Sequence, residues 1–147
     1  MIYLGADHRG FGLKEKLKKY LLETGYQISD VGTSSEESVD YPPIAGKVAA
    51  GVKEDLNNRV ILLCGSGVGG CIAANKFKGI RAGEPRDETS AIHARIADNI
   101  NVLCLAADAL SEEETKKIAK AFLDTSFSGE ERHKRRLAQI EEIEKNN

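Results

Sequence analysis

Apolar residues along the chain follow two alternating patterns. Short unbroken apolar runs predict buried β-strands, and longer segments with apolar residues at every third or fourth position predict amphipathic α-helices. The predicted strands cover residues 2–6, 26–31, 60–64, 79–82 and 101–106. The first predicted helix contains the apolar positions from Leu13 to Leu21 and is stopped by Gly25. The other predicted helices cover residues 44–56, 68–77, 88–97, 111–123 and 129–145. This alternation predicts the α/β class, with a doubly wound, five-stranded parallel sheet in a three-layer α/β/α arrangement.

The last two predicted helices carry informative local patterns. Ser111 and Glu114 have the spacing of a capping box, which fixes the start of the first of them. The final helix is highly charged and has a narrow apolar stripe made of Leu137, Ile140 and Ile143. Because this stripe is too narrow for a full core face, we expect the C-terminal helix to pack on a partner subunit.

Composition narrows the class of protein. Hydrophobic residues make up 41% and charged residues 30% of the 147 residues, which is ordinary for a globular chain. The sequence shows no linker segment, so residues 1–147 are predicted to form a single domain. The net charge of −2 argues against general nucleic-acid binding, and no apolar run reaches membrane-span length. No signal peptide is recognisable. Three cysteines without metal-ligand spacing favour a cytoplasmic location, with Cys71 and Cys104 predicted to fill the core.

The richest segment for function is residues 62–76, where an apolar strand ends at Cys64 and a loop with four glycines leads into a helix. The backbone N–H groups of such a loop can converge on one anion, helped by the helix N-terminus. The positive potential there should favour the thiolate of Cys64. A thiolate beside an oxyanion cradle is suited to proton abstraction next to a carbonyl. A phosphate-binding turn beside an unreactive buried cysteine has the same pattern, so both interpretations stay open on this segment alone.

Two other polar segments also follow predicted strands. Asp7 and His8 follow the first strand, and residues 106–108 follow the fifth. Ligands of parallel sheets bind beyond the carboxyl ends of the strands. The sequence therefore predicts one site at this edge of the sheet, formed by these segments together with the loop after Cys64.

Five segments occur in an order that resembles a known family. They are Gly5-Ala6-Asp7-His8-Arg9-Gly10, Asp40-Tyr41-Pro42, Cys64-Gly65-Ser66-Gly67-Val68-Gly69, Ala73-Ala74-Asn75-Lys76 and Arg132-His133-x-x-Arg136. With them the chain resembles the type B ribose-5-phosphate isomerases, in the sugar-phosphate isomerase family that includes galactose-6-phosphate isomerase subunits. The resemblance implies a Rossmann-like fold and a homodimer or dimer of dimers with active sites shared between subunits. It also implies aldose–ketose interconversion through a cis-enediolate, with ribose 5-phosphate as the leading substrate and no metal or other cofactor.

The resemblance also assigns roles to individual residues. Cys64 is implied to move the proton between C1 and C2, Ser66 to assist at the substrate oxygens, and Asp7 to contact the sugar. The implied substrate-binding residues are His8, Tyr41, Gly65, Gly67, Gly69, Gly70, Asn99, Arg132, His133 and Arg136.

The phosphate end of the substrate is implied to contact His8 and the arginines of the final helix. Arg132 and Arg136 are four residues apart and therefore share a helix face, with His133 close by. Two guanidinium groups on one face suit a phosphate dianion. Without the family resemblance, the neighbouring Lys134 and Arg135 would favour a solvated basic stripe instead.

The chain departs from the family pattern around the fifth strand. Family members usually carry a His-Asn pair before this strand, where this chain has Ala97 and Asp98, and that histidine is thought to open the furanose ring. After the strand the family often has an arginine where this chain has Asp108. A carboxylate there would repel a phosphate dianion, so we expect Arg86 or Arg95 to pair with Asp108, or the phosphate to bind elsewhere.

Three hypotheses account for the missing histidine. His93 shares a helix face with Ala97 and could replace the histidine, although it lies about 6 Å away along the axis. The substrate could instead be a tetrose 4-phosphate such as erythrose or erythrulose 4-phosphate, which cannot close a furanose because its O4 is esterified. The protein could also bind a sugar phosphate without catalysis, although the intact Cys64 argues against this. A further departure from the family pattern is the stretch of residues 83–87, which is more charged than is usual at this position.

Overall fold

The computed structural model describes all 147 residues and shows an α/β fold. Its strands are β1 (Ile2–Ala6), β2 (Ile28–Asp30), β3 (Arg59–Cys64), β4 (Ala82–Gly83) and β5 (Val102–Ala106). Its helices are α1 (Phe11–Glu23), α2 (Tyr41–Glu54), α3 (Val68–Ala74), α4 (Glu88–Asp98), α5 (Glu112–Asp124) and α6 (Glu131–Lys145). All strands are parallel, in the order β2-β1-β3-β5-β4. The predicted Rossmann-like, five-stranded parallel sheet is therefore confirmed.

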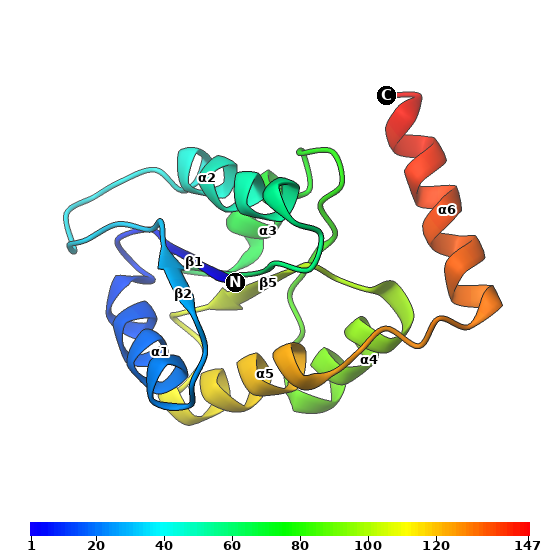
Figure 1. Cartoon of the computed structure of the whole chain (residues 1–147). Coiled ribbons are helices and arrows are strands. Elements are labelled where there is room, and N and C mark those ends of the chain that lie inside the picture. Colours follow the sequence, from blue (N-terminus) through cyan, green and yellow to red (C-terminus); the bar gives the residue numbers. More distant parts are fainter.

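The sheet lies between two layers of helices. Helices α2 and α3 cover one face, and α1, α4 and α5 cover the other (Figure 1). Along β3, Val60 and Leu62 belong to the core under α2 and α3, whereas Ile61 and Leu63 belong to the core on the other face. Because both faces are buried, the strand is an unbroken apolar run rather than an alternating one. No helix has the length and apolar character needed to cross a membrane.

Several element boundaries differ from the sequence prediction by up to three residues. Helix α2 begins at Tyr41 rather than at residue 44, since Pro42 and Pro43 occupy its first turn, where a missing N–H costs no hydrogen bond. Strand β4 is only Ala82–Gly83 instead of residues 79–82. The backbone before it is held by a side chain, because the amide of Arg81 donates to Oδ1 of Asn101 at 2.8 Å. β2 is likewise shorter than predicted.

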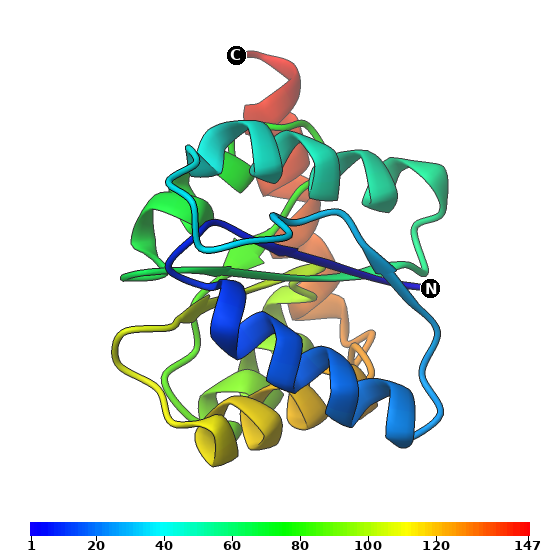
Figure 2. The same ribbon diagram turned by 90° about the vertical axis from the view of Figure 1, so that its left-hand side faces the viewer.

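Helix α6 stands apart from the layered body, and the view of Figure 2 places it behind the sheet. Only His133 of its residues is buried. Ile140 and Ile143 of the predicted apolar stripe are 49% and 63% exposed. The carboxylate of Glu144 accepts a hydrogen bond from the amide of Gly79 at 2.9 Å, which holds the helix loosely against the chain. Packing of this stripe on a partner subunit therefore stays a prediction.

A buried lysine fastens α1 to the loop after β2. Lys14 is 1% exposed, and its Nζ donates to both carboxylate oxygens of Asp30, at 2.9 and 2.7 Å, and to the carbonyl of Thr33 at 2.9 Å. Lys18 also donates to Asp30, at 2.7 Å. Burial raises the pKa of Asp30, but the hydrogen bonds from the two lysines and the Gly32 amide outweigh burial, so the net pKa is lowered.

Replacing Lys14 with methionine should lower the free energy of unfolding by about 2 kcal/mol at pH 7, because it removes the buried cation of this ion pair while Lys18 keeps its contact with Asp30. The lowered pKa of Asp30 means that this carboxylate stabilises the fold above its unfolded pKa and loses that effect as pH falls through the folded value. The difference between wild type and Lys14→Met should therefore shrink at pH 3. Denaturant titration at both pH values measures it.

Lys19→Met is the matched control, because Lys19 lies on the same helix but its side chain is 78% exposed and only 3.9 Å from Glu23. It should change the free energy of unfolding by less than about 0.5 kcal/mol. A Lys14 variant as stable as this control would show that the buried ion pair contributes nothing.

Candidate active site

Three neighbouring strands bring the predicted polar segments to one edge of the sheet. In the sheet β3 lies between β1 and β5, with Leu63 beside Ala6 and Cys64 beside Ala106. Asp7 follows β1 directly, and its amide donates to the carbonyl of Leu63 at 3.2 Å. The predicted meeting of these three segments at the carboxyl ends of the strands is thus what the structure shows.

The glycine loop after Cys64 packs so closely that side chains there would not fit. The thiol of Cys64 lies against the backbone amides of Gly67 and Gly70. A Cβ on Gly70 would lie 3.2 Å from Sγ of Cys64, and one on Gly69 would lie 2.9 Å from the hydroxyl oxygen of Tyr41. Gly67 has a φ of 79°, a conformation that disfavours other residues. The loop forms a floor of backbone amides, with Ser66 exposed above it.

The expectation of a stabilised thiolate at Cys64 is wrong for this chain on its own. Burial raises the pKa of the thiol, which is 3% exposed, and the amides of Gly70 and Gly67 oppose this only in part. The nearby carboxylates of Asp7 and Glu84 raise the pKa further. The net pKa is therefore above its ordinary value, because desolvation and negative charge outweigh two backbone donors.

The side chains of Asp7 and His8 each use one polar atom to contact backbone groups of neighbouring segments. Oδ1 of the buried Asp7 accepts hydrogen bonds from the amides of Arg9 and Gly10, both at 3.0 Å, and so shapes the turn into α1. Nδ1 of His8 lies 3.2 Å from both the amide nitrogen and the carbonyl oxygen of Val39. Oδ2 of Asp7 and Nε2 of His8 stay available for a ligand.

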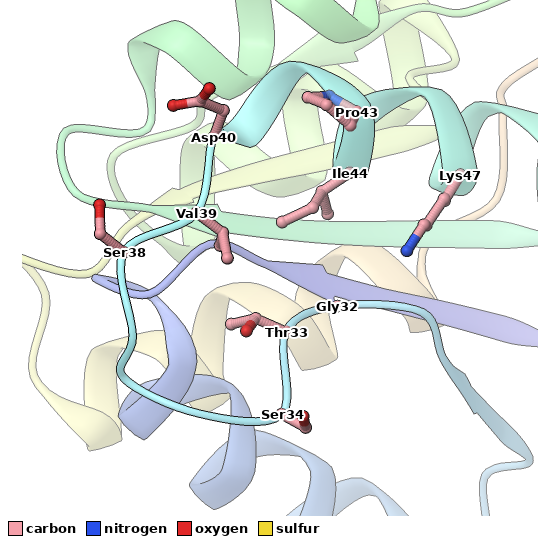
Figure 3. A pocket seen from close by; sticks show the side chains of 9 residues that line it. All are labelled: Gly32, Thr33, Ser34, Ser38, Val39, Asp40, Pro43, Ile44 and Lys47. Carbon is pink, nitrogen blue, oxygen red and sulfur yellow. The ribbon is translucent and has the colours of Figure 1, made fainter.

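The loop that holds His8 also forms the wall of an open cavity of about 540 Å³ (Figure 3). Val39 and Asp40 line it on one side, and the ammonium group of Lys47 points into it from α2. Tyr41, which directly follows the lining residue Asp40, packs against Gly69, so the cavity adjoins the glycine loop.

Asp108 pairs with neither of the two arginines that the sequence analysis proposed. Its carboxylate forms an ion pair with the guanidinium of Arg9. Arg86 instead lies 3.6 Å from Asp87. Arg95 is buried, which lowers its pKa to about 10, and donates to the carbonyls of Thr125 and Ile100 at 3.0 and 2.6 Å. Arg9 and Asp108 are far apart in the sequence but meet in space because β1 and β5 flank the same strand.

Four predicted substrate-binding residues lie away from Cys64 within one chain. Asn99 precedes β5, whose length of about 13 Å separates it from the carboxyl ends of the strands. It ends α4 with a φ of 47°, and its Oδ1 accepts a hydrogen bond from Arg95 at 2.8 Å. The other three are on α6, which stands on the far side of the sheet from the loops after β1 and β5 (Figure 1).

The side chains on α6 differ in their surroundings. Arg132 is exposed and its Nε donates to Glu130 at 2.9 Å, and Arg136 is exposed as well. His133 is buried, with its Nδ1 2.7 Å from the hydroxyl of Ser128. In this chain His133 therefore fixes the start of α6. Both arginines are exposed, and Arg132 is held by Glu130 through Nε alone, so guanidinium N–H groups of both can bind a group outside the chain.

The structure adds two residues that the sequence analysis did not select as site residues. The guanidinium of Arg9 packs on Gly65, and the carboxylate of Glu84 packs on Gly67. Burial raises the pKa of Glu84. Glu84 belongs to the charged stretch 83–87, so the unusual charge of this stretch was the signal in the sequence that could have identified it. His93, the candidate replacement for the missing histidine, is exposed on α4. No three His, Cys, Asp or Glu side chains converge to hold a metal ion.

Comparison with known proteins identifies the family. The model of the Ribose/Galactose Isomerase family matches residues 2–140. Ribose-5-phosphate isomerase B of Escherichia coli is 41% identical over 143 residues, covering 97% of this chain and 95% of the relative. D-erythrulose-4-phosphate isomerase of Pectobacterium atrosepticum is 39% identical over 129 residues, covering 87% and 85%.

A solved structure agrees with the sequence relatives. Ribose-5-phosphate isomerase B from Mycoplasma genitalium with bound ribulose-5-phosphate superimposes with a TM-score of 0.94 at 38% identity, covering 99% of this chain and 97% of that one. The chain therefore belongs to the Ribose/Galactose Isomerase family and is a sugar-phosphate isomerase that interconverts aldoses and ketoses.

Proposed function

We propose that this isomerase interconverts ribose 5-phosphate and ribulose 5-phosphate, with Cys64 as the base. The observation that carries the proposal is the thiol of Cys64 set against the amides of Gly67 and Gly70. In the aldose-to-ketose direction the thiolate removes the proton from C2, and the electron pair moves toward the C1 oxygen. In the resulting cis-enediolate a proton passes from the C2 hydroxyl to the C1 oxygen, with Ser66 assisting at these oxygens. Protonated Cys64 then returns its proton at C1, which leaves a ketone at C2 and a hydroxyl group at C1. The loop amides and Ser66 stabilise the oxyanion through the reaction.

The remaining groups at the strand ends would orient the sugar phosphate. Oδ2 of Asp7 is placed to accept a hydrogen bond from a sugar hydroxyl, since Oδ1 is already occupied by two amides. Nε2 of His8 is available for the phosphate end, and Tyr41 covers Gly69 at the side of the loop. These contacts hold the substrate so that C1 and C2 lie over Cys64.

The full site requires a second copy of the chain in this proposal. Arg132, Arg136 and Asn99 lie away from Cys64 within one chain, and α6 has an apolar stripe that the chain itself leaves uncovered. Val68 and Ile72 of α3 are 51% and 57% exposed beside the glycine loop. A homodimer, or a dimer of dimers, would cover these apolar residues and bring the partner's arginines to the phosphate.

The cysteines support a cytoplasmic location. Cys64, Cys71 and Cys104 are all free thiols. Reducing compartments keep thiols in this state, and a base at Cys64 requires an unoxidised sulfur.

A tetrose 4-phosphate is the second candidate substrate. Ala97 provides no group that could open a furanose ring, and one relative is named for D-erythrulose 4-phosphate. A tetrose 4-phosphate needs no ring opening, because its O4 carries the phosphate. Membership in an isomerase family removes the support for the third hypothesis, a binding protein without catalysis.

Deuterium incorporation at C2 in heavy water tests the substrate. Purified enzyme is incubated in parallel with ribose 5-phosphate and erythrose 4-phosphate, and exchange is followed by NMR. We expect faster exchange on ribose 5-phosphate. Exchange confined to the tetrose would contradict the pentose assignment and support the second candidate, whereas exchange on neither would contradict both.

A further inference from the structure

The guanidinium of Arg9 packs against Gly65 of the glycine loop. Arg9 lies in the turn between β1 and α1, directly after His8. A Cβ on Gly65 would lie 2.6 Å from Cζ and Nε of Arg9 and 2.7 Å from Nη1. These separations are far below van der Waals contact, so only glycine at position 65 allows the guanidinium to pack there. Gly65 thus provides space as well as a backbone amide.

Asp108 holds the other end of the same guanidinium. Its carboxylate pairs with Nη2 of Arg9, and its backbone amide donates to the carbonyl of Gly65 at 3.0 Å. The pair thereby joins the carboxyl ends of β1 and β5 across β3. The side chains of Arg9 and Asp108 are 57% and 45% exposed, and ion pairs at such exposure contribute little to folding stability. The arrangement fixes the direction of the guanidinium more than it stabilises the fold.

The carboxylates around the glycine loop would repel an anionic ligand, so binding of an anion there requires a cationic side chain. Asp7, Glu84 and Asp108 place carboxylates around the glycines. Arg9 is the basic side chain that contacts this loop. Asp108 accepts from one N–H of Nη2, whereas Nε, Nη1 and the second N–H of Nη2 have no acceptor in the chain. That second N–H forms a two-donor edge with a neighbouring nitrogen of the guanidinium, and such an edge matches two oxygens of one phosphate.

We infer that Arg9 binds the phosphate group of the substrate, with Asp108 and Gly65 as the residues that position it. This inference rests on the proposed function only in that the ligand is a sugar phosphate. It places the phosphate at the end of the site that includes Nε2 of His8. It also assigns a role to Asp108, which neutralises part of the guanidinium charge and directs the side chain toward the loop.

Calorimetric titration with inorganic phosphate tests the inference without requiring turnover. We compare the Kd of wild type, Arg9→Met, Arg9→Lys and Arg86→Met. Loss of two charge-assisted hydrogen bonds should weaken binding about ten- to hundredfold in Arg9→Met. Arg9→Lys keeps the charge without the fork and should fall between Arg9→Met and wild type. Arg86→Met is the matched control, since its guanidinium is 89% exposed and contacts Asp87, and it should stay within about twofold.

Two results would overturn the inference. One is phosphate affinity in folded Arg9→Met equal to that of wild type, with thermal unfolding as the check of the fold. If Arg9→Met does not fold, unchanged affinity in Arg9→Lys overturns it equally. The other is wild-type protein that does not bind inorganic phosphate at millimolar concentration. An enzyme that binds phosphate through Arg9 but isomerises no pentose would refute the proposed substrate and leave this inference standing.

Discussion

Replacing Cys64 with alanine should lower kcat about 10²- to 10⁴-fold, because the variant lacks the base that moves the proton between C1 and C2. The fold should persist, since alanine is smaller than cysteine and the loop conformation depends on the glycines rather than on the thiol. The measurement is turnover of ribose 5-phosphate, with inorganic phosphate binding as a check that the site is intact. Binding should change little, because the phosphate contacts do not involve the sulfur.

Cys71→Ala is the control for this experiment. Its thiol lies half-buried on α3, 3.5 Å from the carbonyl of Ala82, and has no place in the proposed proton transfer. Its kcat should stay within about threefold of wild type, as expected for a change outside the reacting groups. Turnover in Cys64→Ala equal to that of Cys71→Ala would exclude Cys64 as the base.

The pH dependence of wild type provides a second readout of the same residue. The reactive form is the thiolate, and burial together with Asp7 and Glu84 raises the pKa of Cys64 above its ordinary value. A raised pKa leaves only a small thiolate fraction at neutral pH, so kcat/KM should increase with pH from 7 to 9. The partner's arginines would oppose the shift and move the rise to lower pH. A rate independent of pH over this range would show that the reacting group does not titrate there.

Hybrid dimers that carry two different inactivating changes should recover activity if the sites are shared between subunits. Arg132→Ala/Arg136→Ala should raise KM about 10²- to 10⁴-fold, since two charge-assisted contacts to phosphate are lost. Combined with a Cys64→Ala subunit, each hybrid dimer has one site with an intact Cys64 and intact arginines. Such hybrids should show about half of wild-type activity at low substrate. Co-expression with two tags and tandem purification isolates them.

Lys134→Met/Arg135→Met provides the matched control on α6, because both positions are exposed cations next to the proposed ligands. This pair should change KM by less than about threefold. Hybrids as inactive as their parents would contradict sharing of the site between two chains. An Arg132→Ala/Arg136→Ala homodimer with normal KM would contradict the phosphate role of α6.

Local patterns were sufficient for the fold. The run from Val60 to Cys64 is apolar at every position because helices cover both faces of the sheet, so a single segment already indicated a buried parallel strand. The capping box of Ser111 and Glu114 is present in the structure as predicted. Prediction was poorest at the short edge strands β2 and β4, where side chains such as Asn101 replace ladder hydrogen bonds.

The charged surroundings of Cys64 and Asp108 are poorly predicted from the sequence. The glycines and the following helix indicated a stabilised thiolate, yet α3 has only seven residues and two carboxylates approach Cys64 from other strands and loops. The sequence likewise suggests Arg86 or Arg95 as the partner of Asp108, whereas Arg9 pairs with it from the end of a different strand. Charges add through space, and sequence distance does not report which of them are close.

The sequence by itself determined the α/β class, the glycine loop after Cys64 and the family, because these depend on short patterns and on the identity of consecutive residues. The tertiary structure decided which charged groups meet at the site: Arg9 on Gly65, Glu84 on Gly67, and α6 with its arginines away from both. The reason is the strand order β2-β1-β3-β5-β4, which places the ends of β1 and β5 on either side of β3 although about a hundred residues separate them along the chain.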